Sequence, residues 1–392
     1  MSKNTLKLFV CVFTSLALQV FPVTSRGEAI PAVPVDQGAE IPAALPVVVA
    51  PSEVKLRYEG RFNTAKPDAV VCAWSASAIT IRFHGTAINA DMDLVTNNRF
   101  EVVVDGVPQK VLAWAETPGR RLYRLASELP DADHTVTIFK CTQGYSPTVS
   151  FFGFQLNPGA AVLNVPAANG RIEVIGDSIS TGVGNEAANE KEPYSANNEN
   201  AFWSYGAITA RAFGAEYACY ALGGKCLWPD NTISSLYDRT IPLAPASPTW
   251  NFEKWKPQVV LINLGTNDFN KGIPEEEGWV KAYHDFVDRV RKNYPEALIY
   301  LALGPILNDE YPAGANRLSI CRKYIQRVKN ECNAGGDPQV RFLEFYTQDR
   351  SLGLGAGWHP SVKRHQYMAK QFSAAIEKDL GWTQAVPSAV PK

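Results

Sequence analysis

The chain has 392 residues, of which 46% are hydrophobic and 20% are charged, and its formal net charge is −1. This length is sufficient for two domains with separate cores, and the composition excludes a chain that is disordered as a whole. The charges are balanced, and no basic tract or helix face rich in lysine and arginine could neutralise a row of phosphates. We therefore expect no nucleic acid partner.

Residues 1–29 have the pattern of a secretory signal peptide. Two lysines precede the apolar stretch 8–21, and small residues near Ser25 or Ala29 are suitable for cleavage. The alternative is an uncleaved membrane anchor, but the apolar stretch is short for a bilayer. We therefore predict a secreted or periplasmic protein that has no membrane partner after the signal is cleaved.

The next part of the chain predicts a linker followed by a domain of β-strands. Residues 30–52 are rich in Pro, Ala and Val with almost no charge, a composition that favours extended backbone. Residues 53–160 show the period of two that is typical of strands, and Asp105-Gly106 is a strong hairpin signal. This pattern predicts an all-β sandwich domain of about eight short strands.

From about Arg171 onward, strands alternate with helices, which predicts a three-layer α/β domain over residues 168–383 with a mostly parallel sheet. The strands are expected at 171–175, 215–221, 258–264, 298–303 and 340–345. The helices are expected at 201–213, 276–294 and 315–331, with a last helix just after Pro360. Residues 384–392 are expected to form a tail.

Four short motifs follow the ends of these strands. In chain order they are Gly176-Asp177-Ser178-Ile179-Ser180, Gly223-Gly224, Gly265-Thr266-Asn267-Asp268 and Trp358-His359-Pro360. The first three lie just beyond predicted strands, and the last follows the fifth strand by a loop. Open α/β folds bind ligands at the carboxyl edge of the sheet. We therefore expect the four motifs to meet there in one site.

The residue types in these motifs suit nucleophilic catalysis. A serine hydroxyl needs a base to take its proton, and it needs hydrogen-bond donors where an oxyanion develops. Ser178 is the candidate nucleophile, although Asp177 or Ser178 alone could simply cap a helix. His359 is the favoured general base, because it alone lies in a glycine-rich loop between a tryptophan and a proline. Of the other histidines, His84 and His134 lie in the predicted β domain. His284 and His365 lie in predicted helices, where we expect surface or packing residues.

Ser, Gly, Asn and His in this order resemble the SGNH hydrolases, a large group of serine esterases and lipases. The resemblance implies an oxyanion hole formed by the backbone amides of Ser178 and of Gly224, or its neighbour Gly223, together with the side-chain amide of Asn267. Asn267 could instead only stabilise the turn after its strand. The expected mechanism is an acyl-enzyme on Ser178, without a metal or organic cofactor.

The chain departs from this group three residues before the histidine. SGNH enzymes usually place an aspartate there to orient the imidazole, whereas this chain has Ala356. A backbone carbonyl in the loop 354–357 that accepts the Nδ1 proton would preserve the required tautomer, and this is our first hypothesis. The second is that Asp349 folds back toward His359. Asp177 and Asp268, which neighbour the motif residues, are expected to hold loops through backbone hydrogen bonds.

The combination of secretion signal, β domain and these motifs resembles carbohydrate esterase family 2 from about residue 54 to 380. That resemblance implies a jelly-roll-like sandwich joined to an SGNH domain. It also implies a serine esterase that removes O-acetyl groups from plant cell-wall polysaccharides, either from acetyl xylan or from the 6-position of a hexose. Separately from the resemblance, we expect a monomer. The partner is then an acetylated polysaccharide or oligosaccharide.

Three aromatic residues are candidates to stack on sugar faces, although each could equally be a packing residue: Trp358, Trp228 and Tyr311. Two alternative functions remain open. One is an SGNH esterase or lipase of another specificity. The other is a carbohydrate-binding protein on an SGNH scaffold, which the missing aspartate motivates.

The cysteines permit but do not require disulfides. Six of the seven follow the predicted signal, and Cys72 with Cys141, or Cys219 with Cys226, are possible pairs in an exported chain. Buried free thiols are the alternative. Two further cysteines, at positions 321 and 332, lie in one predicted helix about 16 Å apart, which is too far for a disulfide.

Overall fold

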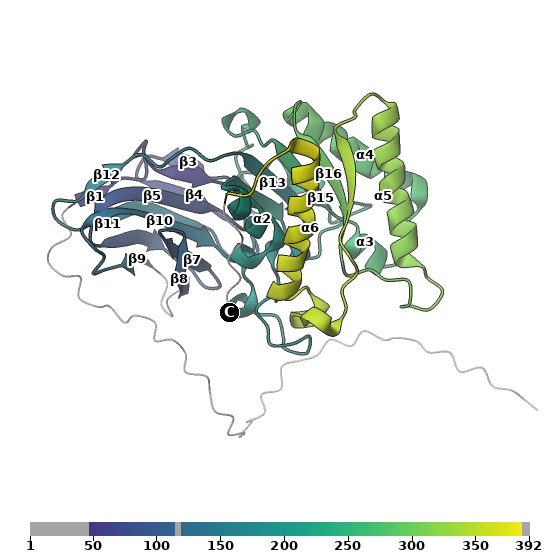
Figure 1. Cartoon of the computed structure of the whole chain (residues 1–392), viewed down its shortest axis with the longest axis horizontal. Coiled ribbons are helices and arrows are strands. Elements are labelled where there is room, and N and C mark those ends of the chain that lie inside the picture. Colours follow the sequence, from purple (N-terminus) through teal and green to yellow (C-terminus); the bar gives the residue numbers. More distant parts are fainter. Residues whose placement is uncertain (1–46, 114–118, 386–392) are drawn as a thin grey trace, which may run out of the picture. The chain divides into compact units, whose positions relative to one another are not determined.

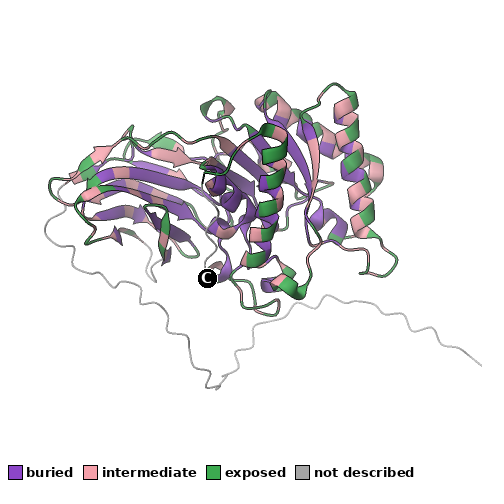
Figure 2. Cartoon of the chain, in the orientation of Figure 1, coloured by how far each residue is buried: buried purple, intermediate pink, exposed green. Residues whose placement is uncertain are grey.

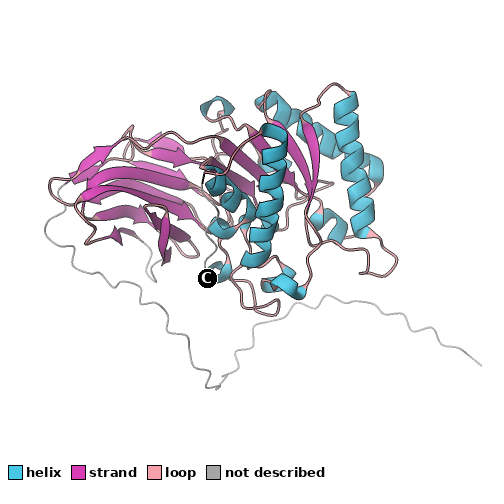
Figure 3. Cartoon of the chain, in the orientation of Figure 1, coloured by secondary structure: helices cyan, strands magenta, loops and turns pink. Residues whose placement is uncertain are grey.

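The computed structural model describes residues 47–113 and 119–385, so the predicted signal peptide and most of the predicted linker lie outside the described residues. The described chain forms strands without helices as far as β12 (Ala161–Leu163), and from β13 (Arg171–Gly176) strands alternate with helices (Figure 3). None of the helices in these two ranges has the length and apolar character that a membrane span requires.

The N-terminal domain consists of two six-stranded antiparallel sheets. The first sheet has the order β3 (Asn63–Lys66), β4 (Ala69–Cys72), β11 (Val149–Leu156), β6 (Ile88–Asp93) and β9 (Arg120–Ala126), and β1 (Val47–Val49) also pairs with β11. The second has the order β12, β5 (Ala78–Gly85), β10 (Ala132–Lys140), β7 (Arg99–Val104) and β8 (Val107–Ala113), and β2 (Arg57–Glu59) also pairs with β5. The all-β prediction is confirmed. The predicted number of strands is too low, because β1, β2 and β12 are too short to show a period in the sequence.

One apolar core lies between these two sheets. Alternate residues of β5, namely Ile79, Ile81 and Phe83, belong to the same buried cluster as Phe154 of the opposite sheet. The predicted hairpin joins β7 to β8, and its Asp105 and Gly106 have φ values of 50° and 79°. The preferred two-residue hairpin turn requires two consecutive positive φ values. The predicted hairpin at Asp105-Gly106 is therefore confirmed.

The C-terminal domain contains a five-stranded parallel sheet with the order β14 (Glu216–Ala221), β13, β15 (Val259–Asn263), β16 (Leu298–Leu303) and β17 (Val340–Glu344). The helices are α1 (Ser178–Thr181), α2 (Tyr205–Phe213), α3 (Thr266–Asn270), α4 (Glu276–Asn293), α5 (Arg317–Ala334) and α6 (Val362–Leu380). The five predicted strands are confirmed to within one residue at each end. The predicted helices are also confirmed, except that the segment 201–213 is divided at Ser204 into a short 3-10 helix and α2, and α5 begins two residues and ends three residues later than predicted.

The sheet is covered on both faces, with α4 and α5 on one side and α2 and α6 on the other (Figure 1). In β13, Ile175 belongs to the core shared with α4 and α5, whereas Ile172 and Val174 belong to the core shared with α2 and α6. Strands β13 to β16 are almost entirely buried, whereas β17 is mostly half-buried, and the outer sides of α5 and α6 are exposed (Figure 2). A strand buried on both faces is apolar almost throughout, which explains the apolar runs in the sequence.

Two boundaries differ from the prediction. Strand β1 lies inside the segment predicted as a linker and pairs with β11, because its three valines are strong strand formers that outweigh the surrounding Pro and Ala composition. In the predicted tail, the Ala385 N–H donates to the Ala212 carbonyl at 2.8 Å, and residues 386–392 lie outside the described residues.

The six cysteines of the described chain are free and buried. The suggested disulfides, Cys72 with Cys141 and Cys219 with Cys226, are therefore wrong, and the alternative of buried free thiols is correct. Spacing along the sequence carries no information about the distance between two buried side chains. The remaining two, Cys321 and Cys332, lie in the continuous helix α5, which keeps them apart as predicted.

Candidate active site

The candidate nucleophile lies where β13 ends and α1 begins. Asp177 caps this short helix, and its Oδ1 accepts a hydrogen bond from the Ile179 N–H at 2.9 Å. A Cβ atom added at Gly176 would lie only 2.3 Å from the Ser180 Oγ, so the sharp turn requires glycine. The cap is thus provided by Asp177, and the hydroxyl of half-buried Ser178 remains available for another partner.

That partner is His359. The Ser178 Oγ and the His359 Nε2 lie 2.8 Å apart, although 181 positions separate the two residues in the sequence. The His359 Nδ1 lies 2.9 Å from the Ala356 carbonyl oxygen. A carbonyl can only accept, so Nδ1 carries the proton and Nε2 presents its lone pair to the hydroxyl. The geometry therefore fits a serine hydroxyl paired with a neutral imidazole base.

The carbonyl reaches the ring because the chain turns back on itself. Gly357 and Trp358 have φ values of 58° and 68°, in the left-handed region, and they lie between Ala356 and the histidine. This turn directs the Ala356 carbonyl toward the side chain three residues later. The first of the two predicted orienting groups, a carbonyl of the loop 354–357, is therefore the one in contact.

Asp349, the second predicted orienting group, faces elsewhere. Its Oδ1 accepts from the Ser351 N–H at 2.9 Å and from the Arg364 guanidinium at 3.1 Å. No contact in the described part of the chain joins Asp349 to His359. This carboxylate caps the short helix at Arg350–Leu352 and pairs with a buried arginine instead.

The loop that carries His359 is held by another loop of the same domain. The Ala356 N–H donates to the Gly184 carbonyl at 3.0 Å, and the Gly357 N–H donates to the Glu190 carbonyl at 3.1 Å. A Cβ atom added at Gly184 would lie 2.6 Å from the Ala356 Cβ. The two loops are therefore in close main-chain contact, and the position of the imidazole depends on residues 184–190.

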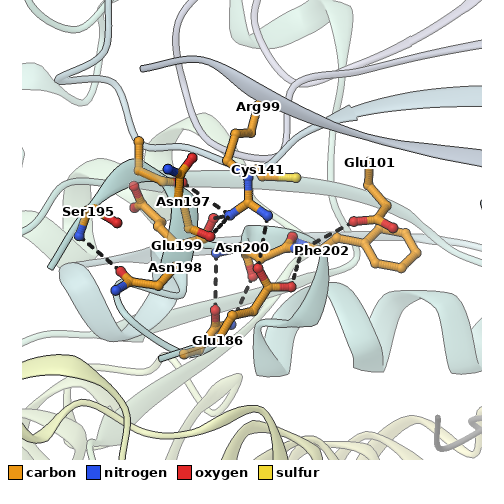
Figure 4. Close-up of polar contacts among 12 residues, drawn as sticks. Arg99, Glu101, Cys141, Glu186, Ser195, Asn197, Asn198, Glu199, Asn200 and Phe202 are labelled. Carbon is orange, nitrogen blue, oxygen red and sulfur yellow. Dashed lines mark hydrogen bonds and ion pairs between the residues drawn. The ribbon is translucent and has the colours of Figure 1, made fainter. Parts of the chain in front are cut away.

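A buried arginine of the β domain anchors that second loop further along (Figure 4). Arg99 of β7 donates to the carbonyls of Ala196, Asn197 and Glu199 at 3.1, 2.7 and 2.9 Å. Its guanidinium also pairs with Glu186 at 3.0 Å. Arg99 is 7% exposed, so these contacts satisfy a charge that has been removed from water. The β domain thus supports His359 indirectly, through the loop that contacts the histidine loop.

The glycine motif lies on the other side of Ser178. A Cβ atom added at Gly223 would lie 3.5 Å from the Ser178 Cβ, which places this loop beside the hydroxyl. The Gly223 N–H donates to the Gln143 Oε1 at 2.7 Å, whereas the N–H groups of Gly224 and Ser178 have no partner among the described residues. Of the two predicted glycines, Gly224 is therefore the one with a free backbone donor.

Asn267, at the start of α3, lies close to the same turn. Its Nδ2 donates to the Asp177 Oδ2 at 3.1 Å and to the Lys225 carbonyl at 2.9 Å. These contacts use both amide hydrogens, so an oxyanion would have to share or replace one of them. Asp268 accepts from the backbone N–H groups of Leu227 and Trp228, which ties the loop after β14 to α3 as predicted.

Burial dominates the electrostatics of the site. It lowers the pKa of His359, against a smaller opposite effect of the Ala356 carbonyl, so the neutral base persists below the ordinary histidine value of 6.5. Burial also raises the pKa of Asp177 to about 7, with the Ile179 N–H opposing and the Asp268 charge adding to the effect. Two acid-sensitive groups therefore lie next to Ser178.

The three aromatic candidates differ in their surroundings. Trp358 is 54% exposed beside His359, and the Arg350 guanidinium lies 5.0 Å from its ring centroid. Tyr311 is 78% exposed in the loop before α5, and its described contact is the N–H bond to the Asn308 Oδ1 at 2.8 Å. Trp228 packs on the first turn of α4 and against the large core. Of the two alternatives for this residue, sugar stacking or packing, these contacts favour packing.

The remaining histidines have local partners. His84 and His134 lie against Asp133 and Asp105 in the β domain, and His284 lies against Asp288 on α4. His365 is fully buried in α6, where its Nδ1 accepts from the Tyr205 N–H at 3.2 Å. Within residues 47–113 and 119–385, no group of three His, Cys, Asp or Glu side chains is arranged to hold a metal ion.

The sequence analysis does not single out the β-domain residues that reach this site. Gln143 and Tyr145 both contact Gly223, and Arg99 anchors the loop behind His359. No motif or spacing marks these residues, because they lie in the all-β half of the chain.

Comparison with known proteins gives a consistent result for both domains. Residues 58–166 match the family described as Carbohydrate esterase 2 N-terminal, and residues 172–372 match the GDSL-like Lipase/Acylhydrolase family. A solved family two carbohydrate esterase from Clostridium thermocellum, in complex with cellohexaose, is 36% identical with a TM-score of 0.78. That alignment covers 83% of this chain and 99% of the solved chain.

Two curated proteins are also similar. The cellulase/esterase CelE of Acetivibrio thermocellus is 36% identical over 331 residues, which cover 83% of this chain and 39% of that protein. An acetylxylan esterase / glucomannan deacetylase of Cellvibrio japonicus is 29% identical over 338 residues, which cover 81% of this chain and 88% of that protein. This chain therefore spans well under half the length of the first of these relatives and most of the second.

Proposed function

We propose that this chain, which belongs to carbohydrate esterase family 2, is a serine esterase that removes O-acetyl groups from plant cell-wall polysaccharides. The proposal rests above all on the 2.8 Å contact between the Ser178 Oγ and the His359 Nε2 at the carboxyl edge of the sheet. The orienting contact from Nδ1 to the Ala356 carbonyl supports it. The names of the two curated relatives support the substrate class.

In the first step, His359 Nε2 takes the proton of Ser178 Oγ as this oxygen attacks the acetyl carbonyl carbon. The new C–O bond leaves the carbonyl oxygen negative, and the N–H groups of Ser178 and Gly224 with the Asn267 amide are the proposed donors to it. The bond from carbon to the sugar oxygen then breaks. The imidazolium returns its proton to that oxygen, which leaves a free sugar hydroxyl and an acetyl group on Ser178.

In the second step, water replaces the sugar. His359 Nε2 accepts a proton from the water as the water oxygen attacks the acetyl carbon, and the same donors receive the second oxyanion. The bond to Ser178 Oγ breaks, Oγ regains its proton from the imidazolium, and acetic acid leaves and loses its remaining proton to the solvent. The Ala356 carbonyl keeps Nδ1 protonated throughout, so Nε2 alone exchanges the proton.

Exposed aromatic side chains next to the base suit a carbohydrate substrate. Trp358 neighbours His359 directly, and we propose that its half-exposed ring contacts the sugar that bears the acetyl group. Tyr311 is exposed enough to serve a more distant sugar unit. Trp228 is a weaker candidate, because its ring already packs on α4.

Substitution of the nucleophile tests the mechanism. Ser178→Ala should lower kcat on acetylated xylan by at least about 10⁴-fold, because the covalent step is lost. Ser180→Ala is the matched control, since Ser180 is buried in the same motif and its hydroxyl bonds to Tyr205. If Ser178→Ala kept near-normal turnover and Ser180→Ala were inactive, Ser178 would not be the nucleophile.

Acetate release from acetylated xylan, glucomannan and pectin tests the substrate class. We expect release from xylan or glucomannan, and faster hydrolysis of nitrophenyl acetate than of long-chain nitrophenyl esters. Preference for long acyl chains would favour the lipase alternative. Binding of cello-oligosaccharides with no release of acetate from any polymer would favour the carbohydrate-binding alternative.

The remaining predictions concern the protein outside its site. We propose that residues 1–29 direct export, that the β domain has a jelly-roll-like topology, and that the protein acts as a monomer. N-terminal sequencing of the mature protein after cell fractionation tests export. An intact N-terminus on a cytoplasmic protein would refute it.

A further inference from the structure

Two side chains of the β domain hold the glycine loop beside Ser178. The Gln143 Oε1 accepts from the Gly223 N–H at 2.7 Å, and the Tyr145 hydroxyl donates to the Gly223 carbonyl at 3.0 Å. Both backbone groups of Gly223 are therefore bonded to the loop that follows β10. These contacts are stronger constraints than packing alone, because a hydrogen bond fixes direction as well as distance.

The Gly223 carbonyl and the Gly224 N–H belong to one peptide group. This bond is trans, since the cis bonds of the described chain are those before Pro229 and Pro312. In a trans peptide the carbonyl and the N–H point in opposite directions. A hydroxyl fixed to the Gly223 carbonyl therefore also fixes the direction of the Gly224 N–H. Donation to the carbonyl polarises the peptide group and makes its N–H a better donor.

The loop after β10 is itself firmly anchored. The buried Lys140 Nζ donates to the Thr142 carbonyl at 2.6 Å and to the Gln143 carbonyl at 3.4 Å. A Cβ atom added at Gly144 would lie 2.7 Å from the Pro242 Cγ and 3.2 Å from the Leu222 Cδ2. The loop is thus pressed against the hydrolase domain, with a buried ammonium group holding its main chain.

A hydrogen-bonded chain also fixes the orientation of the Gln143 amide. Its Nε2 donates to the Tyr194 hydroxyl at 3.3 Å, and that hydroxyl donates to the Glu199 Oε2 at 2.9 Å. With Nε2 committed to Tyr194, only Oε1 is left for the Gly223 N–H. The amide cannot flip without leaving two donors face to face.

We propose that Gln143 and Tyr145 are positioning residues that set the Gly223–Gly224 peptide so that the Gly224 N–H serves as an oxyanion donor. This role rests on the proposed esterase function and extends it, because it gives the β domain a part in the reaction. The two side chains act through the backbone of Gly223, and neither forms a hydrogen bond with Ser178 or His359.

Steady-state kinetics of Tyr145→Phe and Gln143→Met on nitrophenyl acetate test the proposal. Tyr145→Phe removes one hydroxyl from a half-exposed ring, and kcat should fall about three- to tenfold. Gln143→Met keeps the side-chain length but loses the acceptor, and kcat should fall about tenfold or more. KM should stay within about twofold of the wild-type value, because substrate is bound elsewhere.

Tyr58→Phe is the matched control. Its hydroxyl donates to the Pro51 carbonyl at 2.7 Å in the same domain, so it loses a comparable hydrogen bond that has no link to Gly223. The control should keep the wild-type kcat, and all three variants should keep the wild-type acid limb of the pH profile, since His359 is untouched. Wild-type kcat in both test variants, or an effect confined to KM, would overturn the positioning role.

Labelling of Ser178 by a fluorophosphonate separates this proposal from the proposed function. The labelling needs the oxyanion donors but no acetylated sugar. A wild-type chain that is labelled but releases no acetate would refute the substrate and leave the positioning role in place. Test variants that are labelled at the wild-type rate would refute the positioning role, even if the polysaccharide activity is confirmed. Tyr145→Phe keeps the test decisive if Gln143→Met fails to fold.

Discussion

The two sides of Ser178 are built in different ways. On the histidine side, main-chain groups of residues 184–190 bond to the loop that carries His359, and the β domain acts behind them, through Arg99 and through Glu101, which accepts from the Asn200 Nδ2 at 3.1 Å. On the glycine side, the β domain acts directly through Gln143 and Tyr145. The base is thus placed mainly by its own domain, whereas the neighbouring peptide is placed by side chains of the other.

This difference separates two requirements of the reaction. Proton transfer depends on the position of one ring, which a local turn of the chain can hold. Stabilisation of an oxyanion depends on the direction of several donors at once. The proposed donors follow three strand ends of the hydrolase domain, and side chains of the β domain hold the peptide that carries one of them. Substitutions on the two sides should therefore differ in size and in the kinetic quantity that they change.

The largest effect is expected on the histidine side. His359→Ala should lower kcat by about 10⁴-fold, because no other described group can take the Ser178 proton. His284→Ala on the surface of α4 is the control and should leave kcat unchanged. Measured rates of acetate release within tenfold of the wild type would show that another base serves Ser178.

A smaller effect is expected on the opposite side. Asn267→Ala should lower kcat by about 10²- to 10³-fold, the usual loss when one oxyanion donor is removed. The Asn267 amide already bonds to Asp177 and Lys225, so the kinetics also show whether it turns toward the oxyanion. Asn270→Ala, on the exposed end of the same helix, is the control. A loss below about threefold would restrict Asn267 to the loop-stabilising role.

The smallest effect is expected at Asp349. Asp349→Asn keeps an oxygen for Arg364, so kcat should stay within about twofold of the wild type. The acid limb of the kcat/KM profile should lie below pH 6.5 in both proteins, because burial lowers the pKa of His359 and only the neutral ring is a base. A limb that shifts in the variant would show that Asp349 reaches the imidazole after all.

Asp177 provides a second test of the same profile. Its pKa is raised to about 7 by burial, and protonation would weaken its hold on the Asn267 amide. A limb near pH 7 that Asp177→Asn removes would assign the loss of activity in acid to this carboxyl. We expect the limb to stay below pH 6.5 and to be unchanged by the substitution, which would assign it to His359.

Much of the hydrolase domain and the centre of its site could be predicted from the sequence. Most of the strands are largely apolar runs, and Ser178 and His359 lie in short motifs that follow strands, so local patterns are sufficient. The carbonyl that orients the ring could also be predicted, because no carboxylate stands near position 356. Features that depend on one contiguous segment can therefore be predicted from the sequence.

The rest depends on contacts between distant parts of the chain. The choice of Gly224 over Gly223 depends on Gln143, 80 positions away, which occupies the Gly223 N–H. The support by Arg99 spans a similar separation. The suggested disulfides failed for the same reason, since their geometry is set by packing rather than spacing. Residues that act on a site from another domain leave no periodic signal.

The turn at Gly357 and Trp358 has a further consequence. Any amino acid at position 356 offers the same carbonyl, so the imidazole needs no acidic side chain there, and the buried site beside Gly184 asks only for a small residue. The demand falls on the next two residues, which must adopt left-handed backbone; glycine does so without strain, and tryptophan at a penalty of about 1 kcal/mol. The backbone conformation, rather than a carboxylate, thus supports the imidazole. A sequence motif that requires an acidic residue three positions before the histidine would therefore fail to detect this hydrolase.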